Sequence, residues 1–104
     1  MAGGGTMNNR TKVKIPPITG IENALKVYYA HSELGNKEIT ILFGKRSPTT
    51  VCRLKQIAKD EMCSRAILSY GANKVNTAVA YDVWGIDVKY LERRMRKIRE
   101  LNLQ

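Results

Sequence analysis

Residues 47–62, SPTTVCRLKQIAKDEM, carry the strongest structural signal in this 104-residue chain. Ser47 is a preferred residue for capping the start of a helix. Pro48 suits the first helical position, where an N–H group would have no helical partner. Apolar residues then recur at i, i+3, i+7 and i+11, which places them on one helical face: Val51, Leu54, Ala58 and Met62. This spacing predicts an amphipathic helix over residues 47–62.

The opposite face of this helix carries Thr49, Arg53 and Gln56, with Thr50 and Cys52 at its flanks. These side chains are able to form hydrogen bonds, whereas a solvated face usually mixes Glu with Lys. Between residues 45 and 59 there are five basic residues and no acid: Lys45, Arg46, Arg53, Lys55 and Lys59. A charge run is often only a solvated surface. Here the absence of acids favours a surface that neutralises phosphates.

A helix is expected over residues 20–34, before this segment. Thr19-Gly20-Ile21-Glu22 fits a capping box, in which a Thr hydroxyl and a Glu carboxylate satisfy backbone N–H groups at the helix start. Ile21 and Tyr28 recur at helical spacing, and Gly35 supplies a left-handed stop.

A shorter helix is expected from Lys37 to Phe43. Asn36 can cap its start and Gly44 can end it. The β-branched run Ile39-Thr40-Ile41 would suit a strand by local propensity. The capping residue and the closing glycine favour the helix.

The run from Glu38 to Lys55 resembles the helix-turn-helix of bacterial and phage DNA-binding proteins of the small, mobile-element type. The residues that match the pattern in kind are Phe43, Gly44, Ser47, Thr50, Val51, Arg53 and Leu54. Gly44 to Val51 spans seven residues where the family usually has six, which affects the angle between the two helices. The resemblance implies an all-α fold with a tri-helical core over residues 18–64. It also implies that helix 47–62 enters the major groove of DNA.

The chemistry of these side chains assigns each a contact with DNA. Arg53 can reach guanine O6 and N7, Gln56 suits adenine, and Thr49 and Thr50 offer hydroxyls to base edges. The expected phosphate contacts lie in the turn and on the flanks of the helix, together with the capping serine: Lys45, Arg46, Ser47, Lys55 and Lys59.

Residues 1–17 are expected to form a flexible basic arm. Arg10 and Lys12 carry positive charge there, and Pro16-Pro17 stiffens the entry to the fold. The arm either lies along the phosphate backbone or in a minor groove, or is a solvated tail.

Residues 65–104 are expected to form a C-terminal helical extension that packs on the core or forms a dimer. Gly71-Ala72-Asn73 predicts a turn. Residues 75–84 fit a helix capped by Asn76 and ended by Gly85. They also fit a strand that would pair with residues 66–70 as the wing of a winged helix, and we expect the helix.

A last helix is expected from Val88 to about Leu101. Leu91, Met95 and Ile98 form an apolar stripe on it, which packs within the monomer or against a second copy in a homodimer. A basic amphipathic helix also fits an anionic membrane surface. The stripe has few aromatic residues, so we expect no membrane partner.

Composition and residue spacing argue against catalysis, metal binding and secretion. If Cys52 and Cys63 share helix 47–62 and its continuation, they lie roughly 16 Å apart along the axis, too far for a disulfide. With His31 they supply too few ligands for zinc, and we expect His31 on a helix surface. No catalytic constellation can be assembled around His31, so we expect no enzyme activity and no cofactor. The chain has a net charge of +9, no recognisable secretory leader and no long apolar segment, which favours a cytoplasmic location.

The sequence therefore predicts a protein that binds double-stranded DNA sequence-specifically, as a bacterial or phage transcriptional regulator. Two alternatives remain open. One is a DNA-recognition component of phage packaging, similar to small terminase subunits. The other is a protein-interaction adaptor whose helix-turn-helix core no longer binds DNA.

Overall fold

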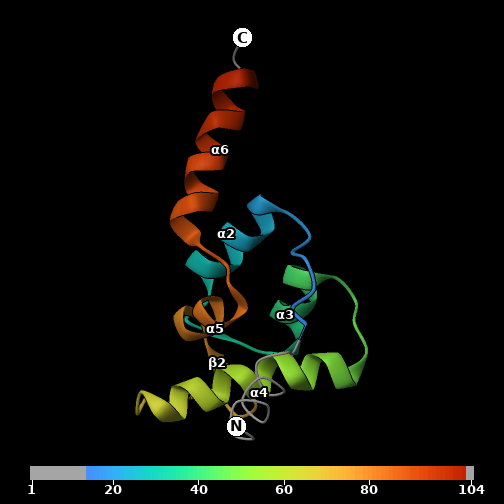
Figure 1. Ribbon diagram of the computed structural model, residues 1–104, viewed down its shortest axis with the longest axis vertical. Coiled ribbons are helices and arrows are strands. Elements are labelled where there is room, and N and C mark those ends of the chain that lie inside the picture. Colours follow the sequence, from blue (N-terminus) through green and yellow to red (C-terminus); the bar gives the residue numbers. More distant parts are fainter. Residues whose placement is uncertain (1–13, 103–104) are drawn as a thin grey trace, which may run out of the picture.

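A computed structural model describes residues 14–102 of the chain, and most of these residues are helical. The helices are α2 (Ile21–Ala30), α3 (Asn36–Phe43), α4 (Pro48–Ser64), α5 (Thr77–Trp84) and α6 (Val88–Asn102). Two short strands, β1 (Glu33–Leu34) and β2 (Val75–Asn76), pair antiparallel. Figure 1 shows α4 lying across one end of the molecule and α6 extending toward the other. The mainly helical class is confirmed, with a small sheet that the sequence did not predict.

Helix α4 begins where the sequence predicts. The Thr50 N–H group donates to Ser47 Oγ at 3.2 Å, and Pro48 is the first helical residue. Leu54, Ala58 and Met62 are buried, as their spacing predicts. The helix continues to Ser64, slightly beyond the expected end.

The buried side of helix α4 packs against the C-terminal third of the chain. Trp84 of α5 donates from indole Nε1 to the carbonyl oxygen of Leu54 at 3.0 Å. Its ring also meets Phe43 of α3 edge to face, with 5.3 Å between ring centroids. A single apolar cluster therefore contains residues of α3, α4 and α5. The expected regions 18–64 and 65–104 share this core.

The expected helix over residues 20–34 is shorter in the structure. Helix α2 ends at Ala30, and Glu33 and Leu34 belong to β1. Gly35 has a φ of −110°, so it is not the left-handed stop that the sequence predicted. Pairing of β1 with the distant β2 ends the helix instead.

The expected capping box at Thr19 is also wrong. Gly20 is the N-cap residue of α2, and no side chain caps this helix start. Thr19 is drawn into a contact with α3, where its hydroxyl donates to the carbonyl oxygen of Ile41 at 2.8 Å. The contact between a Glu carboxylate and the N-cap N–H group that defines one half of a capping box forms instead at α3. There the Gly35 N–H group donates to Glu38 Oε1 at 2.8 Å. Helix α3 thus begins one residue earlier than expected, with Gly35 as its N-cap residue.

The helical interpretation is confirmed over residues 77–84, whereas Val75 and Asn76 form β2. Asn76 Oδ1 accepts from the Val79 N–H group at 3.0 Å, and Gly85 ends α5 with a φ of +73°. The alternative wing is wrong, because residues 66–70 form no strand and β2 pairs with β1. The predicted turn at residues 71–73 is present.

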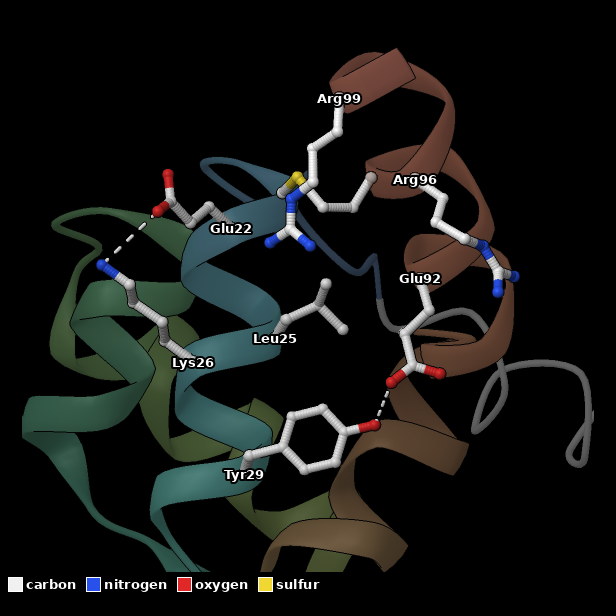
Figure 2. Close-up of a pocket in the computed structure, with 8 residues that line it drawn as sticks. Glu22, Leu25, Lys26, Tyr29, Glu92, Arg96 and Arg99 are labelled. Carbon is white, nitrogen blue, oxygen red and sulfur yellow. Dashed lines mark hydrogen bonds and ion pairs between the residues drawn. The ribbon is translucent and has the colours of Figure 1, made fainter. Parts of the chain in front are cut away.

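Helix α6 packs against α2 near its start and becomes more exposed toward its end. Leu91 is 6% exposed and belongs to the core, Met95 is half-buried, and Ile98 is 38% exposed. The hydroxyl of Tyr29 on α2 donates a hydrogen bond to the carboxylate of Glu92 on α6 (Figure 2). This contact fixes the first turns of α6 to α2.

Candidate nucleic-acid interface

The outward face of α4 presents polar and cationic side chains to solvent. Leu54 and Ala58 are buried beneath the helix, and α5 lies on that side. Thr49, Arg53 and Gln56 lie on the opposite face by helical spacing, and all three are exposed. The structure thus brings together three of the predicted base contacts on one accessible surface.

The turn between α3 and α4 adds two exposed cations, Lys45 and Arg46. Arg46 Nε donates to the carbonyl oxygen of Phe43 at 3.0 Å, which holds its side chain beside the turn. A guanidinium has further N–H donors that remain for a phosphate. Both cations adjoin the N-terminus of α4, where backbone N–H groups and the helix dipole also favour anions.

The hydroxyls at this helix start have different surroundings. Ser47 Oγ and Thr50 Oγ1 lie 3.0 Å apart and share a hydrogen bond, and Ser47 Oγ also accepts from the Thr50 N–H group. Thr50 is half-buried, whereas Thr49 is exposed. Of these three residues, Thr49 is therefore the best placed for a partner.

Lys55 differs from the outward-facing phosphate contact that the sequence predicted. Its Nζ donates to Asn36 Oδ1 of α3 at 2.8 Å, and the side chain is half-buried. Burial, with a smaller contribution from nearby Lys59, lowers the pKa of Lys55. Lys55 thus ties α4 to α3 at the edge of the interface. Lys59 is exposed.

The carboxylate of Asp60 marks the C-terminal limit of the cationic surface. Gln56 Nε2 donates to Asp60 Oδ1 at 2.9 Å, one helical turn away. Asp60 shares the outward face with Arg53 by helical spacing and would repel a phosphate there. A base contact by Gln56 requires this hydrogen bond to be exchanged for one to the base.

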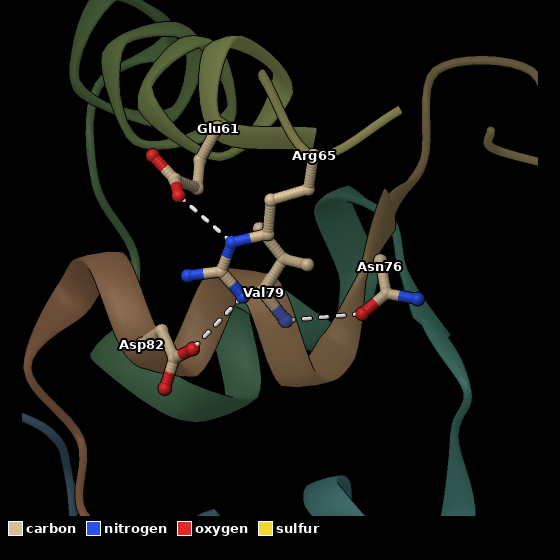
Figure 3. A network of polar contacts seen from close by, with 5 residues as sticks. All are labelled: Glu61, Arg65, Asn76, Val79 and Asp82. Carbon is tan, nitrogen blue, oxygen red and sulfur yellow. Dashed lines mark hydrogen bonds and ion pairs between the residues drawn. The ribbon is translucent and has the colours of Figure 1, made fainter. Parts of the chain in front are cut away.

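The C-terminal end of α4 is held to α5 by ion pairs. Arg65, just after the helix, donates from Nε to Glu61 at 2.8 Å and from Nη1 to Asp82 of α5 at 3.1 Å (Figure 3). These contacts raise the pKa of Arg65. Glu61 therefore has a structural role, because together with Asp82 it holds Arg65 between α4 and α5.

A polar contact that the sequence did not predict holds the loop after α4. The Glu33 carboxylate accepts from the N–H groups of Tyr70 and Gly71 at 2.7 and 2.8 Å. The Tyr70 contact is the larger cause of a lowered pKa for Glu33. No local signal could reveal this contact, because Glu33 lies 37 residues before Tyr70. The loop presents Leu68 and Tyr70 to solvent, at 82% and 96% exposed.

His31 and the two cysteines do not form a metal site within the residues that the structure describes. His31 lies just beyond α2, in extended backbone rather than on a helix surface, with Nδ1 3.9 Å from Glu38 Oε2. Cys52 and Cys63 are exposed thiols on α4. Within residues 14–102, no three His, Cys, Asp or Glu side chains gather as metal ligands. Arg10 and Lys12 lie outside the described residues.

None of the helices described in residues 14–102 has both the length and the apolar character needed to cross a membrane. Comparison with known proteins gives no match to a protein family, to a curated sequence or to a solved structure.

Proposed function

We propose that this chain binds double-stranded DNA sequence-specifically through the outward face of α4. The observation that carries the proposal is the exposure of Arg53 and Thr49 in the N-terminal part of a helix that α5 supports from the opposite side. Lys45, Arg46 and Lys59 surround these two residues, and no acid lies among them before Asp60.

Each group has a defined task in this proposal. Arg53 donates two hydrogen bonds to guanine O6 and N7 in the major groove, and Thr49 contacts a neighbouring base or phosphate. Lys45, Arg46 and Lys59 neutralise phosphates and set the position of α4 on the duplex. Lys55 acts mainly by holding α4 against α3. Gln56 contributes once Asp60 releases it.

The proposal includes a helix-turn-helix arrangement of α2, α3 and α4 and a role as a bacterial or phage transcriptional regulator in the cytoplasm. A homodimer would place two α4 helices on paired half-sites. Leu91 is occupied in the core of the monomer, so the contact between two copies would depend on Met95, Ile98 and Leu101, of which Leu101 is 67% exposed.

The test measures fluorescence anisotropy with a randomised DNA duplex pool at several salt concentrations, and recovers the bound sequences. We expect an enriched motif. We also expect log affinity to fall with log salt with a slope of roughly −3 for three phosphate contacts. Arg53→Ala should lose the motif preference. Lys37→Ala, which removes an exposed cation on α3, is the matched control.

The alternatives predict different results. Salt-dependent binding with no enriched motif would contradict sequence recognition and favour a packaging role. An absence of binding near 100 mM salt would contradict DNA binding altogether and favour a protein-interaction adaptor.

A further inference from the structure

The outward side of α6 carries a second set of cationic side chains, far from those on α4. Six basic residues between positions 89 and 99 are all exposed: Lys89, Arg93, Arg94, Arg96, Lys97 and Arg99. Lys89, Arg93 and Lys97 follow one another at four-residue spacing and therefore form a line along the helix. Buried Leu91 lies on the opposite side, so this line faces solvent.

The acid within this segment is turned away from the cationic line. Glu92 accepts a hydrogen bond from the Tyr29 hydroxyl of α2, and this contact raises the pKa of Tyr29 (Figure 2). The Glu92 carboxylate is thus held between α6 and α2. No acid other than Glu92 lies between Lys89 and Lys97 in the sequence. Asp87 precedes the line, and Glu100, one turn after Lys97, borders the same surface hollow as Arg93 and Lys97.

This cationic line and α4 lie at opposite ends of the molecule. The described chain is 56 Å along its longest axis, with α4 across one end and α6 rising toward the other (Figure 1). Helices α2 and α5 lie between them. A straight duplex that lies along α4 would therefore pass the end of the molecule remote from α6.

The chemistry of the α6 face fits a phosphodiester backbone better than a membrane or a base edge. A membrane-surface helix inserts its apolar side, but Leu91 of α6 is buried and Met95 lines the groove beside Leu25 of α2, which leaves Ile98 and Leu101 as the exposed apolar residues near the end of the helix. Guanidinium groups match phosphate oxygens through paired hydrogen bonds. The outward line holds no Asn, Gln, Ser or Thr between Lys89 and Lys97, so it lacks the amides and hydroxyls that accompany Arg53 on α4.

We propose that the outward face of α6 binds the phosphate backbone of a second DNA segment without reading its sequence. One chain then bridges two duplexes, one on α4 and one on α6. This inference rests on the proposed function of α4, which supplies the first duplex.

A bridging assay tests the inference. A duplex with the motif selected by the full-length protein is fixed to beads, and a fluorescent duplex of unrelated sequence is added with the protein. We expect recovery of the second duplex. The triple variant Lys89→Ala/Arg93→Ala/Lys97→Ala should bind the selected duplex within about twofold of wild type and lose roughly tenfold or more of the recovery.

The matched control Lys26→Ala/Lys37→Ala/Lys74→Ala removes the same charge from exposed positions on α2, on α3 and in the loop before β2. It should retain recovery, which separates the position of the charges from net charge. Light scattering of each variant establishes its molar mass, because a dimer with two α4 helices would also bridge duplexes.

Three outcomes overturn the inference. Recovery that survives in the α6 triple variant would show that another surface binds the second duplex. Wild-type protein that binds the selected duplex but recovers no second one would overturn bridging and leave the α4 proposal intact. Binding without any selected motif that is lost in the α6 triple variant would overturn both bridging and the α4 proposal.

Discussion

The indole Nε1 of Trp84 donates a 3.0 Å hydrogen bond to the carbonyl oxygen of Leu54, joining α5 to the middle of α4. Leu54 is buried, and the next residue toward the N-terminus, Arg53, is exposed on the proposed DNA-binding face. The orientation of that face thus depends on a residue that lies 30 positions further along the chain.

Trp84→Phe should lower the free energy of unfolding by about 2 kcal/mol, because it removes the indole donor and leaves space beside Phe43. Chemical denaturation followed by circular dichroism measures the change. Tyr90→Phe removes only a hydroxyl group at an exposed position on α6 and should leave stability nearly unchanged. Equal losses in the two variants would contradict a specific role for the Trp84 contact.

Ser47→Ala should destabilise the start of α4 by about 1 kcal/mol, since Ser47 Oγ accepts from the Thr50 N–H group. Hydrogen exchange should quicken at the first turns of α4, including the Thr50 amide. Ser64→Ala, an exposed serine at the other end of the same helix, is the control and should not affect these amides. Unchanged exchange at Thr50 in Ser47→Ala would argue against the cap.

Local signals in the sequence predicted α4 and α5 well because their caps lie next to the helices they start. Ser47 and Asn76 each accept from a backbone N–H group three residues later. Thr19 carried an equally good local signal, but its hydroxyl donates to Ile41, 22 residues away. A tertiary contact, rather than the local capping pattern, therefore determines the position of the Thr19 side chain.

The candidate interface was predictable in part for the same reason. Helical spacing alone placed Arg53 and Thr49 on the outward face. The burial of Lys55 depends on how α3 packs against α4 and places Asn36 beside it. The spacing of residues within α4 does not reveal this packing. The pairing of β1 with β2 was likewise hidden, because each strand has only two residues.

Acid should loosen the loop after α4 through Glu33. Hydrogen bonds from the Tyr70 and Gly71 N–H groups lower the pKa of Glu33 in the folded state below its ordinary value of 4.5. The ionised carboxylate therefore stabilises the fold above that value, and this contribution is lost as pH falls below 4.5 toward the lowered pKa. Amide chemical shifts of Tyr70 and Gly71, followed by NMR from pH 6 down to about pH 3, should report this titration.

Glu33→Gln should remove most of this pH response, because the amide does not ionise. Exchange of the Tyr70 and Gly71 amides should also quicken at neutral pH, since one acceptor oxygen is lost. Glu22→Gln is the control, as Glu22 forms an exposed ion pair with Lys26 on α2. If the two amides titrate alike in wild type and Glu33→Gln, Glu33 does not hold the loop.

Arg53→Ala should weaken binding to the selected DNA motif by about 1–3 kcal/mol and leave binding to unrelated DNA nearly unchanged. The reason is that a paired contact with guanine contributes only where that base is present. Arg53→Lys retains the charge but loses the planar donor pair, so its affinity for the motif should fall nearly as far. Lys59→Ala should instead weaken binding to both DNAs alike and make the salt slope shallower by about one. Anisotropy titrations of the three variants against both duplexes separate these effects. If Arg53→Ala and Lys59→Ala lose equal affinity for both duplexes, Arg53 contacts only phosphate and α4 does not read sequence through it.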